Sequence, residues 1–469
     1  MTHNDVPHYD IAILGGGPAG YTGAIRGAQL GRKVCLIEKE QLGGTCLWKG
    51  CIPSKAYLNA SELLYKAQHS SDFGIHIEGQ ITADFNAIFN RKENIVSLLN
   101  NGIKSLLKSQ GVTVIYGAGS LRNSRTLEIK TGDNSSQLIT ADNILLCTGS
   151  RPASLADLPA DGEMILSTDQ FFQLKKLPES ILILGAGYTG CETAFTLSEL
   201  GVDVTLVEMM PLPLPGADID ISTLLARQFR KRKIRLLTDT RLLSFDRMNP
   251  GIRAHFSKGD PTIVNQILIG IGRALNTENM GFQDAGLGIG PKGQVIVNEK
   301  MQTNIPGIYA AGDMVGKMML AHVASKQALI AVENMCGHNR EMKYHAIPSC
   351  TFTHPPIASV GLTQQDCEQQ KIPIRTGRFQ VRTLAAYQVA GELDGLVKVI
   401  AKESTGQILG IHLMGKNVAE MLGECVLAVK NEMTDKDFAE HIRAHPTMAE
   451  AIQEAVEDSF GLSIHTPKK

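Results

Sequence analysis

The strongest constraint on the fold is a glycine pattern that occurs twice along the chain. In each copy, glycines spaced G-x-G-x-x-G follow an apolar run, and a glutamate ends the next apolar run. Each position of the second copy lies 170 residues after its counterpart: Gly15, Gly17, Gly20 and Glu38 against Gly185, Gly187, Gly190 and Glu208. Such loops bind the pyrophosphate of a dinucleotide, because bare backbone and a helix N-terminus meet there. Two copies in register predict two Rossmann-like domains.

The residues around each loop predict a strand, a helix and a second strand in succession. The first copy predicts a strand over 9–14, a helix to Leu30 and a strand over 34–37. The second predicts a strand over 181–184, a helix to Leu200 and a strand over 202–207. The pattern alone leaves open that one copy binds no nucleotide.

The second glutamate also bears on the choice of dinucleotide. A carboxylate at Glu208 accepts hydrogen bonds from ribose hydroxyls and repels a 2′-phosphate. Met209 and Met210 follow it, where arginines would bind that phosphate. The second loop is therefore predicted to bind NAD rather than NADP.

Two cysteines after the first loop suggest redox chemistry. Cys46 and Cys51 stand in the run GGTCLWKGCIPSK. On a straight helix their Cα atoms would be roughly 8 Å apart, beyond the ~7 Å that a disulfide spans, so a bridge requires a bend, which Gly50 permits. A helical pattern over 56–66 puts a positive helix end near Cys51, which favours its thiolate. Taken alone, the pair is also compatible with buried thiols or half of a metal site, although no second pair completes four ligands.

The composition excludes several classes of protein. At 469 residues the chain is too long for a single hydrophobic core of ordinary size, which predicts three or more domains. A net charge of −1 gives no footprint for nucleic acid, and no apolar run approaches the length of a membrane span. Residues 1–8 are polar and lead directly into a predicted strand, so no signal peptide is expected. Nine irregularly spaced cysteines indicate a reducing cytoplasm, with four buried thiols expected: Cys35, Cys147, Cys191 and Cys425.

One run of charge departs from this balance. Positions 230–233 are all basic, in the order Arg, Lys, Arg, Lys, and Arg235 follows. A solvated helix end is the ordinary explanation, and docking to an acidic partner is the alternative.

Together these motifs resemble those of the flavoprotein disulfide reductases over residues 9–460. Beyond the two loops and the cysteine run, the matches are LLCTGS at 145–150 and TNIPGIYAAGD at 303–313. The resemblance implies an α/β fold with two Rossmann-like domains, one for FAD on the first loop and one for NAD on the second, and a C-terminal α+β dimerisation domain. It also implies a homodimer whose active sites are shared between subunits.

The resemblance assigns roles to individual residues around the cofactors. Cys46 becomes the thiol that exchanges with the substrate, and Cys51 the thiol that faces the flavin. Lys55 and Glu192 form an ion pair beside the flavin, although from sequence alone an ordinary surface pair is possible. FAD is further held by residues of three motifs and of the helix at 321: Thr45, Lys55, Thr148, Gly149, Asp313 and Ala321. Arg273 and Tyr188 are expected near the nicotinamide nucleotide, Tyr188 either as a gate or as a packing residue.

A histidine and a glutamate near the C-terminus complete the catalytic set. The resemblance makes His445 the catalytic base and Glu450 the residue that orients it. Thr447 and Glu450 also have the spacing of a capping box for a helix that runs to Ser459, so the sequence leaves both roles open. A histidine that titrates near neutrality suits proton exchange with a thiol.

The implied activity is the oxidation of a dithiol, such as a free or protein-bound dihydrolipoyl group, with reduction of NAD. Three segments depart from the family pattern: Trp48–Lys49 between the cysteines, residues 325–328 and residues 382–390. They leave open an NADH-dependent reductase of another disulfide or a persulfide. A non-catalytic flavoprotein that docks other proteins or senses redox state is the alternative from a different class, and the complete set of cysteines, His445 and Glu450 argues against it.

Four segments describe the expected organisation. Residues 1–150 begin the FAD domain, 151–275 form the NAD domain, and 276–346 return to complete the FAD site. Residues 347–469 form the dimerisation domain, with strands of alternating polarity over 395–401 and 408–413.

Overall fold

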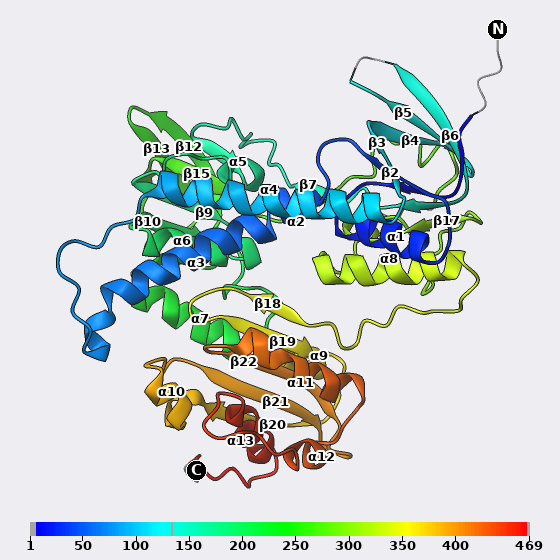
Figure 1. Ribbon diagram of the computed structural model, residues 1–469. Helices are drawn as coiled ribbons and strands as arrows, with labels where there is room; N and C mark the ends of the chain where they lie inside the picture. The colour runs from blue at the N-terminus through cyan, green and yellow to red at the C-terminus, as the bar shows by residue number, and fades with distance from the viewer. Residues whose placement is uncertain (1–5, 133–134, 467–469) are drawn as a thin grey trace.

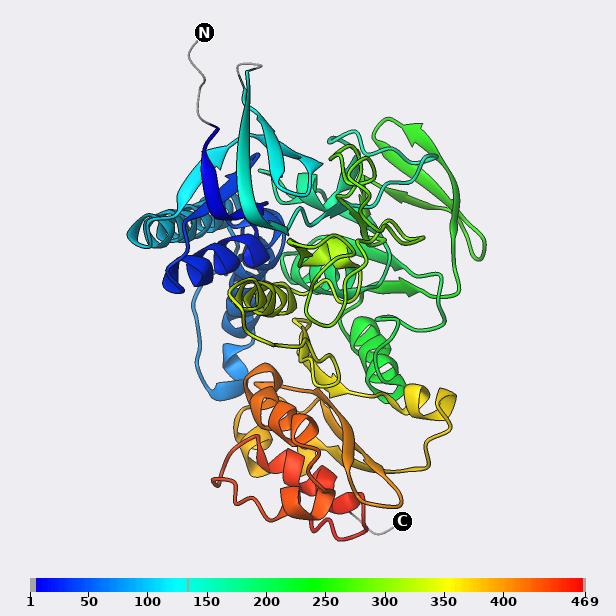
Figure 2. The same ribbon diagram turned by 90° about the vertical axis from the view of Figure 1, so that its right-hand side faces the viewer.

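The computed structural model describes residues 6–132 and 135–466, and in this range it contains three large sheets (Figure 1). Most of the segment 1–8, on which the expected absence of a signal peptide depends, lies outside the described residues. Two sheets carry the glycine loops, and the third lies in the C-terminal part of the chain at one end of the molecule (Figures 1 and 2).

The first sheet forms around the first glycine loop, in the order β3-β2-β1-β6-β5-β4, and β17 pairs with β6 as well. The strands β3, β2, β1 and β6 run parallel to one another, and β17 runs parallel to β6. In contrast, β5 is antiparallel to β6, and β4 is antiparallel to β5. Since β17 follows the whole second sheet in sequence, the chain returns to the first sheet late. The bounds are β1 His8–Leu14, β2 Val34–Glu38, β3 Thr113–Tyr116, β4 Ala118–Asn123, β5 Thr126–Lys130, β6 Ser136–Leu146 and β17 Ile308–Ala310.

Two helices, α1 (Pro18–Gln29) and α8 (Ala321–Met335), pack against each other beside this sheet (Figure 1). Close approach of α1 to the turn after β1 explains the third glycine of the loop. A Cβ added at Gly20 would lie 1.7 Å from the carbonyl oxygen of Gly15. Any larger residue would therefore push the helix N-terminus away from the glycine loop.

The second sheet repeats this plan with five parallel strands in the order β11-β10-β9-β15-β8. Helices α5, α6 and α7 accompany it, a hairpin sheet of β12, β13 and β14 lies beside it, and β7 pairs with β16. The bounds are α5 Thr168–Phe171, α6 Tyr188–Glu199, α7 Ile219–Lys231, β7 Ser150–Pro152, β8 Ile165–Ser167, β9 Ser180–Leu184, β10 Asp203–Val207, β11 Arg235–Leu237, β12 Leu242–Met248, β13 Gly251–Phe256, β14 Thr262–Val264, β15 Gln266–Ile269 and β16 Arg273–Leu275.

The third sheet is antiparallel, in the order β18-β19-β22-β21-β20, and α11 and α13 pack on it. Its strands are β18 Ser349–Thr351, β19 Ile357–Gly361, β20 Ile374–Gln380, β21 Leu396–Lys402 and β22 Ile408–Met414. Its helices are α9 Gln364–Gln369, α10 Ala385–Val389, α11 Val418–Lys430, α12 Asp435–Ala439 and α13 Glu450–Asp458.

The predicted α/β class is confirmed, and the strands and helices around both loops begin and end within a residue of the prediction. The prediction that β21 alternates between buried and exposed positions is wrong. Every residue of β21 except Lys402 is buried, Lys398 included. The Lys398 ammonium donates to Asp218 at 2.7 Å, at the N-terminus of α7, so the face expected to meet water meets the second sheet's helix instead.

Three more helices lie between β2 and β3 in the chain: α2 (Gly44–Trp48), α3 (Cys51–Gln68) and α4 (Phe85–Ser109). The helix predicted over 56–66 therefore begins five residues earlier, at Cys51 itself. α3 packs against both α4 and α6, which brings the cysteine run from the first sheet to the second glycine loop. None of the helices in the described residues is long and apolar enough to cross a membrane.

Candidate active site

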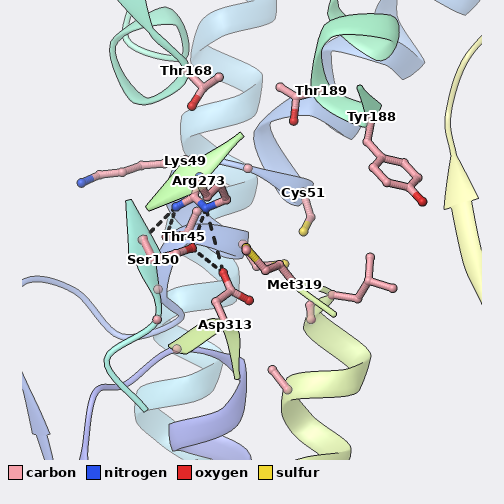
Figure 3. Close-up of a pocket in the computed structure, with 18 of the residues that line it drawn as sticks. Thr45, Lys49, Cys51, Ser150, Thr168, Tyr188, Thr189, Arg273, Asp313 and Met319 are labelled. Carbon is pink, nitrogen blue, oxygen red and sulfur yellow. Dashed lines mark hydrogen bonds and ion pairs between the residues drawn. The ribbon is translucent and has the colours of Figure 1, made fainter. Parts of the chain in front are cut away.

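A cavity of about 1930 Å³ runs between the two glycine loops and past the cysteine run (Figure 3). Its walls come from both parallel sheets, the start of α8, β18 and one face of α11. Every residue expected to bind a cofactor lines it except Gly20 and Gly190, each of which lies against the backbone of its own loop. A single space is therefore large enough to join two dinucleotide sites to a pair of thiols.

The first loop presents bare backbone to this cavity. Gly15 has a φ of +108°, which places the turn in the region that glycine favours, and a Cβ added at Gly17 would meet only the Cα of Gly44, at 3.8 Å. The Glu38 carboxylate accepts hydrogen bonds from the backbone N–H groups of Gly16 and Glu40, both at 2.7 Å. These bonds hold the acid at the end of β2 beside the loop.

The second loop has the same geometry. Gly185 has a φ of +92°, and a Cβ added at Gly187 would meet nothing within 4 Å, so the backbone there faces open space. The Glu208 carboxylate accepts from the N–H groups of Ala186 at 2.8 Å and Met210 at 2.9 Å. Both loops thus leave room for a pyrophosphate, which fits FAD and NAD as the two groups.

A hydrogen-bonded cluster lines the cavity beside the first loop (Figure 3). Asp313 accepts a hydrogen bond from the Ser150 hydroxyl at 2.5 Å, and Arg273 donates to the same hydroxyl at 2.6 Å. Arg273 also donates to Thr45 at 3.3 Å and lies 3.9 Å from Asp313. Although it was expected near the nicotinamide nucleotide, its contacts are with residues expected to hold FAD.

The remaining FAD positions line the same part of the cavity. The Thr148 hydroxyl donates to the carbonyl of Asn276 at 2.5 Å, and Gly149 adopts a φ of +68° in the turn after β6. α8 begins at Ala321, and no side chain caps its N-terminus among the described residues. Its first N–H groups are therefore free to bind a ligand.

The cysteine run bends where the sequence predicted. α2 ends at Trp48, and α3 begins at Cys51 after a break at Gly50, which has φ −155° and ψ −112°. Both thiols are free and interact with each other. The hydrogen bond from Cys46 and the charge of Lys55 lower the pKa of Cys51 to about 7, whereas its partner and burial raise the pKa of Cys46. In the reduced pair, Cys51 therefore forms a thiolate more readily than Cys46 does.

Lys55 and Glu192 meet across the packing of α3 on α6. The Lys55 ammonium donates to both carboxylate oxygens of Glu192, at 2.8 and 3.0 Å, and lies 4.4 Å from the ring centre of Phe352. Glu192 also accepts from the backbone N–H of Phe352 at 3.0 Å. The two side chains are only 30% and 11% exposed, so this is not an ordinary surface pair.

His445 and Glu450 form the predicted pair, and Glu450 takes part of the capping role as well. One carboxylate oxygen is 2.9 Å from Nδ1 of His445, and the other accepts from the Thr447 N–H at 2.8 Å. The Thr447 hydroxyl donates to the carbonyl of Ala444 and does not cap the helix, which begins at Glu450. The full capping box is therefore absent. The His445 side chain is 72% exposed and lines no part of the cavity.

Tyr188 is the first residue of α6 and lines the cavity with its ring 48% exposed. Its hydroxyl accepts a hydrogen bond from Ser349 of β18 at 3.1 Å. In Figure 3 the phenol points away from Cys51 towards the strand. The ring thus spans from the second loop to the C-terminal sheet.

The basic run at 230–233 is partly used within the chain. Arg232 pairs with Glu199 at 2.6 Å, and Lys231 pairs with Asp394. A simple solvated helix end is therefore wrong for Arg232, which is 14% exposed, whereas Lys231 ends α7 and is 65% exposed, as that interpretation predicts. The four thiols expected to be buried are buried, and burial raises the pKa of Cys35 to about 12.

Several functional contacts were not predicted from the sequence. Lys49, between the cysteines, donates to Glu40 at 2.9 Å and lies 3.7 Å from Asp169 of α5. Ser150 ends a motif that the sequence did identify, but its link between Asp313 and Arg273 depends on the pairing of β7 with β16. No local pattern marks the contacts of Lys49 with Asp169 or of Ser150 with Asp313 and Arg273, because these join residues far apart in sequence.

Comparison with known proteins gives consistent relatives over the whole length. The family model described as pyridine nucleotide-disulphide oxidoreductase matches residues 9–328, and the model of the dimerisation domain of that class matches residues 347–456. A dihydrolipoyl dehydrogenase of Chlamydia trachomatis is 38% identical over 461 residues, which cover 98% of both chains. A dihydrolipoyl dehydrogenase of Bacillus subtilis is 35% identical and covers 97% of this chain and 99% of its own.

Solved structures agree with these relatives. LpdA from Mycobacterium tuberculosis matches with a TM-score of 0.89 at 30% identity, over 96% of this chain and 99% of its own. The HOCl-induced flavoprotein disulfide reductase RclA from Escherichia coli matches with a TM-score of 0.85 at 24% identity, over 96% and 99% of the two chains. At that identity the second match bears on the fold alone.

Proposed function

The chain belongs to the pyridine nucleotide-disulphide oxidoreductases, and from this membership we propose that it is a dihydrolipoyl dehydrogenase. It oxidises a free or protein-bound dihydrolipoyl dithiol through Cys46 and Cys51, with FAD and NAD as cofactors. The observation that carries the proposal is the position of these two thiols, with a lowered pKa at Cys51, in one cavity with two dinucleotide loops.

The cysteines perform the first half of the reaction by thiol–disulfide exchange. From the oxidised pair, a substrate thiolate attacks the sulfur of Cys46, the Cys46–Cys51 bond breaks, and Cys51 leaves as a thiolate. The second substrate thiol then attacks the mixed disulfide, which releases the cyclic disulfide and leaves the electron pair on the two cysteines. The lowered pKa makes Cys51 a good leaving group at neutral pH, and Lys55 stabilises the charge that it acquires.

When bound, FAD accepts the electron pair from the cysteines and NAD carries it away as hydride. Glu38 and Glu208 would orient the ribose of their nucleotides, and the uncapped N–H groups at the start of α8 would bind the flavin. Lys55 and Glu192 hold each other in place as an ion pair between the FAD site and the NAD site. These assignments, and those of Thr45, Thr148, Gly149, Asp313, Ala321, Tyr188 and Arg273 as cofactor contacts, form part of the proposal.

The base for the substrate comes from a second copy of the chain. Within one copy, His445 is 72% exposed outside the cavity, and α13 lies at the far end of the molecule from α2 (Figures 1 and 2). The chain carries the dimerisation domain of its family. In a homodimer with shared sites, His445 takes the substrate proton and Glu450 holds the ring by its Nδ1 nitrogen.

The proposal includes the organisation and setting of the enzyme. Residues 1–150 and 276–346 form the FAD domain, 151–275 the NAD domain and 347–469 the dimerisation domain. The substrate is a lipoyl group, carried by a lipoyl domain of a multienzyme complex in the cytoplasm.

An initial-rate assay of the purified protein with dihydrolipoamide and NAD, beside Cys46→Ser, tests the proposal. We expect fast turnover with NAD that disappears in the variant. Negligible lipoamide turnover by a yellow protein whose disulfide is reduced by NADH would refute it and favour another disulfide or persulfide substrate. A biological role that the Cys46→Ser variant still performs would instead indicate a docking subunit or redox sensor.

A further inference from the structure

A buried cluster of charged groups lies behind the active site and takes no part in the chemistry above. At its centre the Glu199 carboxylate, 3% exposed, is bonded to three groups. It accepts from Arg232, just after α7, at 2.6 Å and from the Ser61 hydroxyl of α3 at 2.8 Å, and one oxygen is 2.8 Å from Nδ1 of His354. The imidazole is also buried, at 7% exposed.

This cluster repeats the contacts of the active-site ion pair farther along the same two helices. Lys55 of α3 meets Glu192 of α6 beside Cys51, and Ser61 of α3 meets Glu199 at the C-terminal end of α6. Glu192 and Glu199 are seven residues apart, which places them on one face of α6. The helices are thus joined by two successive polar links.

A single segment of the C-terminal part of the chain secures both links. The backbone N–H of Phe352 donates to Glu192, and two residues later the His354 ring is bonded to Glu199. The Lys55 ammonium also lies over the Phe352 ring. A shift of this segment relative to α6 would therefore move the groups that hold Lys55 and Glu192.

The charges around His354 favour its protonated form. Burial by itself lowers the pKa of this imidazole. Its hydrogen bond to Glu199 and its ion pair with Glu392, which is 3.9 Å away, raise the pKa above the ordinary value. Burial opposes the charge on Glu199, yet His354, Ser61 and Arg232 lower the pKa of that carboxyl. From α3, the Tyr65 ring faces His354 edge-on at 5.0 Å, with its face towards Arg232. The other charged groups near Glu392 are Lys66 and Lys416.

We infer that His354 and Glu199 are positioning residues for the redox centre: their contact holds α3, α6 and the 352–354 segment so that Lys55 stays beside Cys51. Neither residue lines the cavity, so neither touches substrate or cofactor. The inference rests on the proposed function only in taking Cys51 as the reactive thiolate. It is tested on that thiol directly and not by turnover.

The experiment measures alkylation of Cys51 by iodoacetamide against pH in the dithiothreitol-reduced, FAD-loaded protein, with the modified peptide quantified by mass spectrometry. The variants are His354→Gln, Glu199→Gln and both together, with Ser61→Ala as a milder change that keeps the ion pair. His255→Gln is the matched control, since His255 forms a comparable pair with Asp246 at 2.8 Å on the exposed β12–β13 hairpin.

Because an opposite charge within a few ångströms lowers a thiol pKa, we expect the alkylation midpoint to rise by about 0.5–1 pH unit in His354→Gln and Glu199→Gln. The alkylation midpoint of the double variant should rise no further than that of the more strongly shifted single variant, because both single variants already lose the same His354–Glu199 contact. Ser61→Ala should shift the midpoint less, in the same direction, and His255→Gln should leave it unchanged. If the two central variants do not fold, Ser61→Ala carries the test.

Midpoints within ~0.2 pH unit of wild type in every folded variant would overturn the inference, even if the variants melt at lower temperature. Such a result would give the cluster a purely structural role. Failure of dihydrolipoamide turnover in the wild-type protein would instead bear on the proposed function, so the two failures are distinguishable.

Discussion

Replacing Cys46 by alanine should raise the pKa of Cys51. The pKa of this thiol lies at about 7 instead of 9, and the largest cause is the hydrogen bond from Cys46. Without that bond, burial opposes the charge and only Lys55 and the helix N-terminus support it, so the pKa should return to about 9. At pH 7.5 the thiolate fraction would then fall from about three-quarters to about 3%.

The pH midpoint of Cys51 alkylation is the appropriate assay. A thiolate of higher pKa is also more nucleophilic, so the rate at pH 7.5 should fall only about threefold although the midpoint moves by about two units. Cys46→Ser retains a hydroxyl that can donate to Cys51, and its midpoint should lie between those of wild type and Cys46→Ala. A midpoint that stays near 7 in Cys46→Ala would refute the reasoning and assign the lowered pKa to Lys55.

Three further predictions follow from other contacts. His445→Gln should lower kcat for dihydrolipoamide by about 10²–10⁴-fold and leave the reduction of the enzyme by NADH unchanged, because the imidazole serves the dithiol only. Glu208→Arg should lower kcat/KM for NAD at least ~10-fold and raise it for NADPH-linked turnover, since the carboxylate both repels a 2′-phosphate and organises the loop. Lys398→Met should destabilise the fold by about 3–5 kcal/mol in urea unfolding, because it leaves Asp218 charged and buried, and Lys398→Met with Asp218→Asn should recover part of that loss.

Each of these predictions has a result that contradicts it. Equal loss of the NADH-driven step in His445→Gln would mean that the residue acts on the cofactors or on folding. An unchanged preference for NAD in Glu208→Arg would place discrimination elsewhere in the loop. A double variant at 398 and 218 that is no more stable than Lys398→Met would show that the pair is not the source of the lost stability.

The bend of the cysteine run and the two glycine loops were predictable because their signals are short and contiguous. The bend between Cys46 and Cys51 follows from the spacing of the thiols and the glycine between them. Both loops and their acids lie within one strand–helix–strand unit, so a single stretch of sequence contains everything that shapes them. The polarity of β21 misled the same reasoning, because Lys398 is charged but buried against a helix that precedes it by 180 residues.

The sequence by itself determined the fold class, the two dinucleotide loops and the bend of the cysteine run, because local backbone geometry and helix ends are set by neighbouring residues. The family resemblance already paired Lys55 with Glu192, but only the tertiary structure decided that His354 supports Glu199 from the loop after β18 and that His445 lies outside the cavity of its own chain. These contacts depend on how α3, α6 and the C-terminal sheet pack. Packing is decided by the summed shape of many side chains and leaves no pattern along the chain.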